Sequence, residues 1–278
     1  MRKSLLLFFS IILIMAGCDT KQNTNDKVME IINRKVYTVA SIDSISSLIK
    51  SSDDLTKEQV NSLRMEVGDF IREYAEHLCD SLNDRLNDPA LTPQETRELL
   101  TAINNMSEPS DETGVGVFKV EGYVTYDISP IFIADIFRDY LNEAEYEFAQ
   151  IEQQEMESPS NIDAEVTISY QEVADRLWRC ERLMTSDSIN EDLKISLKPY
   201  INTYMIIMIY GADNTPAFDW DTHMMSQDVK DAILNYISEH PESECTAVLK
   251  EYVTILEKSR YYESHATRAF YFNYLRNN

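Results

Sequence analysis

Residues that break helices are scarce in this chain, which has six glycines and eight prolines among 278 residues. Over most of its length apolar residues recur every three or four positions, as Val60, Leu63, Val67 and Ile71 do. That spacing places apolar side chains along one face of an α-helix. A sandwich or barrel of short strands needs more turn residues than this chain contains. The sequence therefore predicts a mainly α fold.

The helical pattern extends over most of the chain and predicts an antiparallel helical bundle of about seven to eight helices. The stretches that carry it run over about residues 27–50, 57–88, 93–106, 130–155, 170–184, 189–210, 228–240 and 241–274. Tyr200–Tyr210 is apolar on nearly every side, so we expect this segment to be the most buried helix. This segment is too short to cross a bilayer.

Residues 107–128 interrupt the helical pattern with glycines, β-branched residues and aromatic residues. Val115–Val120 and Tyr123–Ile128 are separated by Glu121-Gly122, which predicts a short β-hairpin, with an ordered loop as the alternative. In a hairpin the side chains of successive residues point to opposite faces, so alternate residues share a face. We expect an inner face that packs on helices, formed by Val117, Val124, Tyr126 and Ile128, and an outer face formed by Phe118, Val120 and Tyr123. The outer face is a candidate binding surface.

The N-terminal residues have a different pattern. Arg2 and Lys3 precede a largely apolar run from Leu5 to Ala16, as in a secretory signal. Residues Met15 to Cys18 read Met-Ala-Gly-Cys and resemble the lipobox of bacterial lipoproteins, although that family prefers leucine at the position of Met15. The resemblance covers residues 1–18 alone. It implies a signal peptide over residues 1–17 and attachment of acyl chains such as palmitate to Cys18 after cleavage.

Lipidation at Cys18 would make the lipid bilayer the first partner of the mature chain. The resemblance also implies a location in the bacterial cell envelope, on a membrane and facing the periplasm or the exterior. Residues 18–26 are polar and are expected to form a tether, followed by one helical domain over residues 27–278. The Ser-Pro-Ser-Asn sequence that starts at Ser158 indicates a possible sub-boundary near residues 157–166.

The chain is strongly acidic, with 25 lysines and arginines against 48 aspartates and glutamates. Loss of Arg2 and Lys3 with the leader would leave 23 cations against 48 acids, a net charge of −25. Such a charge repels nucleic acid phosphates, so we expect no nucleic acid partner. The other expected partner is a protein or a peptide.

Three cysteines would remain beside Cys18, namely Cys79, Cys180 and Cys245. An odd number cannot form a closed disulfide framework, and each lies in a helical pattern where a thiol packs as a small apolar group. The sequence favours three free thiols but leaves one disulfide open.

Residues with catalytic or metal-binding chemistry are few. The densest cluster is Asp219, Asp221 and His223, in a segment without helical pattern. Two carboxylates and an imidazole are able to bind a divalent cation or exchange a proton, but they also commonly cap surface turns. We expect the capping role, with no metal and no cofactor.

The sequence therefore predicts a membrane-anchored envelope lipoprotein that acts as a non-enzymatic binding or assembly component. One alternative is an envelope enzyme that uses the Asp219-Asp221-His223 segment. Another is an acidic inhibitor or immunity-type protein that binds a cationic partner. An apolar cleft flanked by these three side chains would favour the enzyme, whereas a cluster exposed to solvent would favour binding.

Overall fold

The computed structural model describes residues 23–277, and the predicted signal peptide and Cys18 lie outside this part of the chain. The fold is mainly helical, as predicted. Its helices are α1 Thr24–Asn33, α2 Val39–Lys50, α3 Lys57–Leu86, α4 Pro93–Asn104, α5 Pro130–Ile136, α6 Glu143–Glu157, α7 Tyr170–Met184, α8 Glu191–Tyr210, α9 Gln227–Glu239, α10 Glu244–Lys258 and α11 His265–Asn277, with a 3-10 turn at Arg138–Tyr140. Three antiparallel strand pairs are β1 Val115–Val120 with β2 Tyr123–Ile128, β3 Asn161–Ile162 with β4 Glu165–Val166, and β5 Gly211–Ala212 with β6 Thr215–Pro216.

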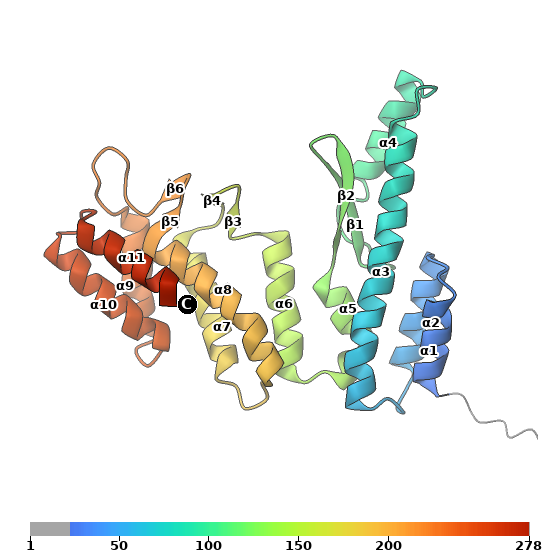
Figure 1. The fold of residues 1–278 in the computed structure, drawn as a ribbon, viewed down its shortest axis with the longest axis horizontal. Coiled ribbons are helices and arrows are strands. Elements are labelled where there is room, and N and C mark those ends of the chain that lie inside the picture. The colour runs from blue at the N-terminus through green and yellow to red at the C-terminus, as the bar shows by residue number, and fades with distance from the viewer. Residues whose placement is uncertain (1–22, 278) are drawn as a thin grey trace, which may run out of the picture.

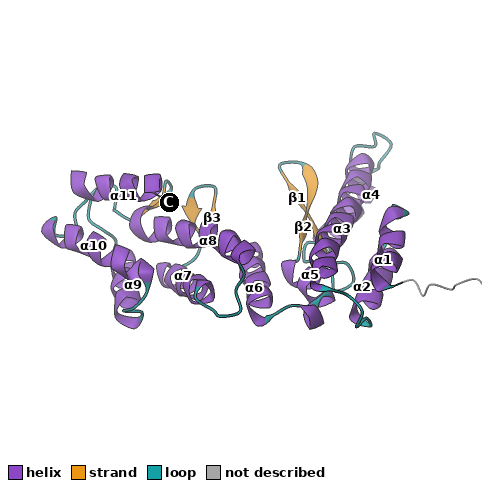
Figure 2. Cartoon of the chain, turned by 60° about the horizontal axis from the view of Figure 1, so that its bottom comes forward, coloured by secondary structure: helices purple, strands orange, loops and turns teal. Residues whose placement is uncertain are grey.

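The molecule is elongated and its core consists of two hydrophobic clusters (Figure 1). One cluster joins α1–α5 with the β1–β2 hairpin, and the other joins α7–α11. Helix α6 lies between the two clusters and contributes side chains to both. Ala149 belongs to the first cluster, and Ala144 and Ile151 belong to the second. Figure 2 shows the same succession of elements after a 60° rotation. The sub-boundary near residues 157–166 stays a prediction.

The prediction of about seven to eight helices was too low, because three predicted helices are each divided in two. The predicted helix at 27–50 is α1 and α2, the one at 130–155 is α5 and α6, and the one at 241–274 is α10 and α11. No glycine or proline marks these breaks. Instead, the second helix of each pair begins after a polar side chain that accepts a hydrogen bond from a backbone N–H three residues later. These pairs are Thr38 with Ser41 at 3.2 Å, Asn142 with Glu145 at 2.9 Å, and Ser264 with Thr267 at 3.2 Å.

The predicted tether at 18–26 was too long. Helix α1 begins at Thr24, where the Asn23 side chain accepts a hydrogen bond from the Asp26 N–H at 2.9 Å. Other predicted boundaries are confirmed: α3 begins at a capping box of Thr56 and Gln59.

The Tyr200–Tyr210 segment of α8 packs into the second cluster, but α8 is not the most buried helix that was predicted, because α7 has eight buried residues among 15 and α8 has seven among 20. In its Tyr200–Tyr210 segment Thr203 is the one exposed residue, and Ile207 is 1% exposed. Among the described residues no helix is long and apolar enough to cross a membrane.

Cys79, Cys180 and Cys245 are free and buried. Burial raises the pKa of the Cys180 thiol to about 12, so this thiol packs as an apolar group.

The predicted hairpin is confirmed, with Val120 opposite Tyr123 across its turn. Glu121 and Gly122 both have positive φ, at 49° and 97°, as the tight turn of a two-residue hairpin requires. The two shorter strand pairs were not predicted. The turns of these two pairs are joined by a hydrogen bond, which the Asn214 backbone N–H donates to the Ala164 carbonyl at 2.8 Å.

Candidate functional site

The predicted Asp219-Asp221-His223 segment lies in an exposed turn between β6 and α9. The Asp219 carboxylate accepts hydrogen bonds from the Thr222 N–H and hydroxyl, both at 2.8 Å, and from the Asp221 N–H at 3.2 Å. These bonds hold the pKa of Asp219 below its usual value. Asp219 therefore closes the turn.

His223 links this turn to the one before α11. Its Nδ1 lies 3.4 Å from a Glu263 carboxylate oxygen, and its carbonyl accepts a hydrogen bond from the Glu263 N–H at 2.7 Å. His223 itself adopts a left-handed conformation with φ of 54°. Across residues 23–277, no three His, Cys, Asp or Glu side chains gather in a way that would hold a metal ion.

The outer face of the β1–β2 hairpin is only partly exposed. Phe118 is half-buried, whereas Val120 is 49% and Tyr123 70% exposed at the end of the hairpin. The inner face packs on α3 through the buried side chains of Val117 and Val124.

The outer edge of β2 is closed by a side chain of α3. The Asn83 amide donates to the Val124 carbonyl at 3.0 Å and accepts from the Val124 N–H at 2.8 Å, as a neighbouring strand would. On the β1 side, the Val117 N–H donates to the Met106 carbonyl at 2.6 Å. Both edges are therefore occupied near the helices, which leaves the tip as the part of the hairpin free to meet a partner.

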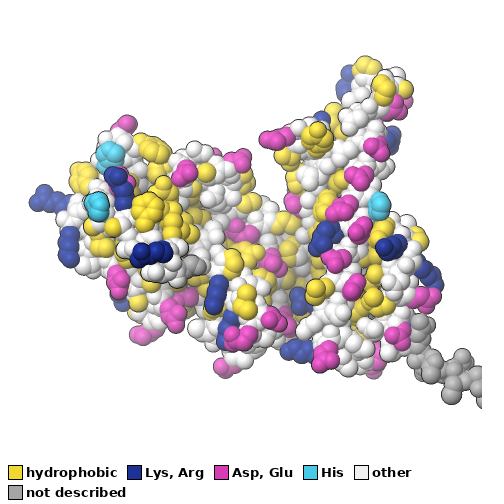
Figure 3. All heavy atoms as spheres, viewed as in Figure 1, with side chains coloured by type: hydrophobic (Ala, Val, Ile, Leu, Met, Phe, Trp, Pro, Cys, Tyr) yellow, Lys and Arg dark blue, Asp and Glu magenta, His cyan; other side chains and the backbone are white. Residues whose placement is uncertain are grey.

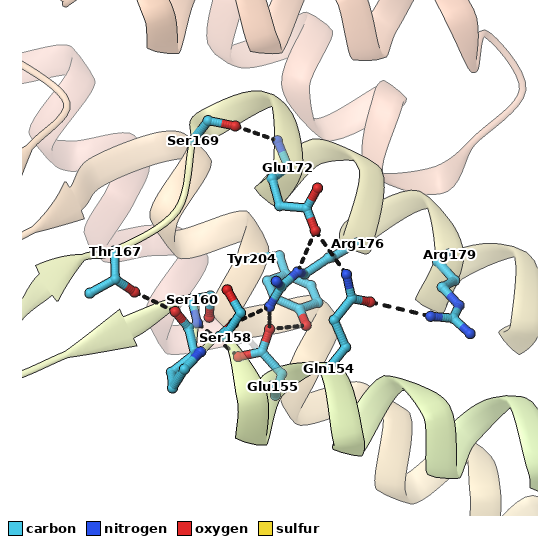
Figure 4. Close-up of polar contacts among 11 residues, drawn as sticks. Gln154, Glu155, Ser158, Ser160, Thr167, Ser169, Glu172, Arg176, Arg179 and Tyr204 are labelled. Atoms are coloured by element: carbon cyan, nitrogen blue, oxygen red, sulfur yellow. Dashed lines mark hydrogen bonds and ion pairs between the residues drawn. The ribbon is translucent and has the colours of Figure 1, made fainter. Parts of the chain in front are cut away.

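A buried ion-pair network connects α6, α7 and α8 (Figure 4). The Arg176 guanidinium donates to the Glu155 carboxylate, to Glu172 at 2.9 Å and to the Ser158 carbonyl at 2.7 Å. Glu155 also accepts from the Tyr204 hydroxyl at 2.7 Å. Burial acts to raise the pKa of Glu155, but the hydrogen bonds and Arg176 together outweigh it, and its pKa lies below the usual value.

A second buried carboxylate, Glu181, is satisfied in the same way. It accepts hydrogen bonds from the Tyr236 hydroxyl, from the Ser243 hydroxyl at 2.5 Å and from the Cys245 N–H at 2.9 Å. In the described part of the chain, every buried side-chain nitrogen and oxygen atom has a hydrogen-bond partner. The two networks therefore stabilise the packing of the second cluster and leave no polar group unpaired for a substrate.

A cleft of about 550 Å³ lies between the two halves of the molecule. Its walls come from α3, from the start of α5, from α6 and from the first turns of α8; they include Asn61, Arg64, Met65, Gly68, Arg72, Ile133, Glu145, Phe148, Glu152, Asn190 and Asp192. Two of its charges are already paired: Arg72 with Asp69 at 2.6 Å, and Glu145 with the Asn142 N–H at 3.0 Å. Arg64 and Glu152 are half-buried, and neither side chain forms a hydrogen bond or a close ion pair with another described residue.

Sequence reasoning missed both the buried network and the cleft. The signal for the network was present, because Arg176 stands within the apolar stripe of α7, one turn after Glu172 and beside Leu177. The cleft had no local signal, since its walls are four segments far apart in the sequence.

No protein-family model, no curated protein and no solved structure matches this chain.

Proposed function

We propose that this protein is a membrane-anchored lipoprotein of the bacterial cell envelope that acts as a non-enzymatic binding or assembly component. The Met-Ala-Gly-Cys sequence ending at Cys18 supports the anchor. A polar segment of about five residues separates Cys18 from α1, so the folded part would lie close to the membrane that holds it.

The observation that carries the binding role is the position of the strand pairs. The β1–β2 and β3–β4 pairs project toward the same side of the molecule, as Figure 1 shows. The β1–β2 pair exposes Val120 and Tyr123 at its tip, and the β3–β4 pair exposes Ile162, which is 48% accessible. Exposed aromatic and branched side chains on projecting turns do not stabilise the core, but they are effective at protein interfaces. We name Val120, Tyr123 and Ile162 the tip surface.

The Asp219-Asp221-His223 turn favours binding over the enzyme alternative. Its side chains are exposed, and Asp219 and His223 hold the turn rather than a pocket. A general acid and base need a cavity in which a substrate meets both groups.

The acidic inhibitor alternative relies on net charge, whereas the tip surface relies on apolar contact. Acidic side chains are spread over both halves of the face in Figure 3 and do not gather into one patch. Added salt screens an attraction between net charges and so weakens binding that depends on charge. Binding through an apolar interface is not weakened in this way. Salt dependence therefore separates the two functions.

The test is capture of membrane and envelope proteins by the full-length lipoprotein after crosslinking, at about 50 mM and about 500 mM salt. The variant Val120→Ser/Tyr123→Ser/Ile162→Ser should lose the partners that the native protein retains at both salt concentrations. Val36→Ser is the matched control, because Val36 is 54% exposed but lies between α1 and α2. Unchanged capture by the triple variant, with an unchanged melting curve, would contradict the tip surface. Capture that disappears at high salt would favour the inhibitor.

A further inference from the structure

The cleft between the two halves contains a glycine that the helix does not need. Gly68 is the twelfth residue of α3, a helix of 30 residues, and so lies in the helix interior. A Cβ atom at this position would meet only the Ile133 Cδ1 atom, at 3.9 Å, which is an ordinary contact. Glycine inside a helix is less stable than alanine, and neither packing nor backbone conformation requires it here. Its effect is to widen the cleft, because Gly68 is part of the wall.

The cleft also brings together two opposite charges that the fold leaves without close partners. Arg64 on α3 and Glu152 on α6 both line it, and each is half-buried. Burial raises the pKa of Glu152, and the charge of Arg64 opposes that change, so the two groups act on each other without forming an ion pair. A half-buried charge without a hydrogen-bonded partner is destabilising, and a ligand that supplies the partner gains that energy.

The wall of the cleft also contains apolar side chains from both halves of the molecule, beside further polar ones such as Asn61 and Asn190. Met65 and Ile133 belong to the first half of the molecule, and Phe148 and Leu193 to the second. The volume of about 550 Å³ is within the usual range for small-molecule sites. A ligand held here would contact both halves of the protein.

We propose that this cleft binds a zwitterionic ligand of the amino acid or short-peptide class, with the carboxylate on Arg64, the ammonium group on Glu152 and an apolar side chain against Phe148. A purely anionic ligand would leave Glu152 unpaired and would face Glu145 and Asp192 as well. A purely cationic ligand would leave Arg64 unpaired. Only a molecule that carries both charges satisfies both groups.

The test is isothermal titration of the protein with free dipeptides that carry apolar side chains, phenylalanyl-leucine, alanyl-leucine and glycyl-phenylalanine, up to about 10 mM. At least one should bind. Acetylation of its amino group and amidation of its carboxylate should each weaken binding about tenfold or more. In Glu152→Gln the penalty for acetylation should disappear, and in Arg64→Gln the penalty for amidation should disappear. Arg85→Gln is the matched control on the same helix, outside the cleft, and should bind as the native protein does.

A cleft-filling variant gives an independent measurement. Gly68→Leu should abolish dipeptide binding while the helical circular dichroism and the melting transition are retained. The proposal is overturned if no dipeptide binds the native protein, if binding survives in both Arg64→Gln and Glu152→Gln, or if a folded Gly68→Leu protein binds as before. These variants do not alter the tip surface, so this proposal and the proposed partner surface fail separately.

Discussion

Replacing Arg176 with methionine should destabilise the half of the protein built on α7 and α8 by about 3–5 kcal/mol, the usual cost of removing one partner of a buried ion pair. The Arg176 side chain is 5% exposed and donates to two carboxylates and a carbonyl. Methionine fills much of the same space, so the loss comes from the polar groups rather than from a cavity. Glu155 would keep its bond from the Tyr204 hydroxyl but lose its counter-charge.

The loss should depend on pH in a defined direction. The pKa of Glu155 is lowered in the folded protein, so its stabilisation is present above the unfolded pKa of about 4.3 and disappears as the pH falls through the folded value. Without Arg176, burial of Glu155 is opposed by fewer interactions, so we expect the pKa of Glu155 to rise. The difference between native protein and variant should therefore be largest near neutral pH and shrink below about pH 4.

Urea unfolding at about pH 7 and about pH 3.5 measures this difference. Arg179→Met, one turn away on α7, is the control. The Arg179 side chain is 29% exposed and lies 3.3 Å from Glu147, so its removal should cost less than about 1 kcal/mol. A loss below about 1 kcal/mol in Arg176→Met, or an equal loss at both pH values, would refute the reasoning.

A second substitution separates the cost of leaving the Glu155 charge unpaired from the cost of losing the hydrogen bonds that Arg176 donates. In Arg176→Met/Glu155→Gln the glutamine carbonyl still accepts from the Tyr204 hydroxyl, but no unpaired charge remains. The double variant should recover about 1–3 kcal/mol relative to Arg176→Met. Equal stability of the single and double variants would mean that Glu155 is already neutral or well solvated.

The other predictions concern separate parts of the chain. Ile207→Ala should cost about 2–5 kcal/mol in thermal or chemical unfolding, and a loss below about 0.5 kcal/mol would place α8 at a surface. Asn83→Leu should cost about 1–3 kcal/mol and speed hydrogen exchange along β2, whereas unchanged exchange would show that its amide does not protect that edge. Gly68→Ala should stabilise α3 by about 0.5–1 kcal/mol, and a lower melting temperature would mean that the cleft is tighter than its geometry indicates. Cys18→Ser should abolish palmitate labelling, and normal labelling would refute the lipobox.

The burial of part of the β1–β2 hairpin determines which substitutions can test the tip surface. From the sequence, replacement of the whole hairpin is the natural test of a binding loop. Because Val117 and Val124 are buried in the first cluster, that replacement would remove core residues together with the surface. Changing only Val120, Tyr123 and Ile162 keeps the hairpin register and its contact with Asn83.

Local features of this protein followed from the sequence alone. The capping box of Thr56 and Gln59, the turn at Glu121-Gly122 and the apolar segment ending at Tyr210 each involve residues within a few positions of one another. The stability of these local structures depends on hydrogen bonds between near neighbours and on the spacing of apolar residues, and both can be read from the amino-acid sequence. The three missed helix breaks belong to the same class, since capping residues such as Asn142 mark them.

Tertiary structure alone decided which distant groups meet. Arg176 reaches Glu155 on α6, Asn83 on α3 closes the edge of β2, and Arg64 and Glu152 line the same cleft from α3 and α6. Each of these relations depends on how whole helices dock, and a shift of one helical turn would change every such pair while leaving the apolar periodicity intact. The sequence pattern specifies which face of a helix is buried, but the neighbour on that face is selected by packing of the entire core.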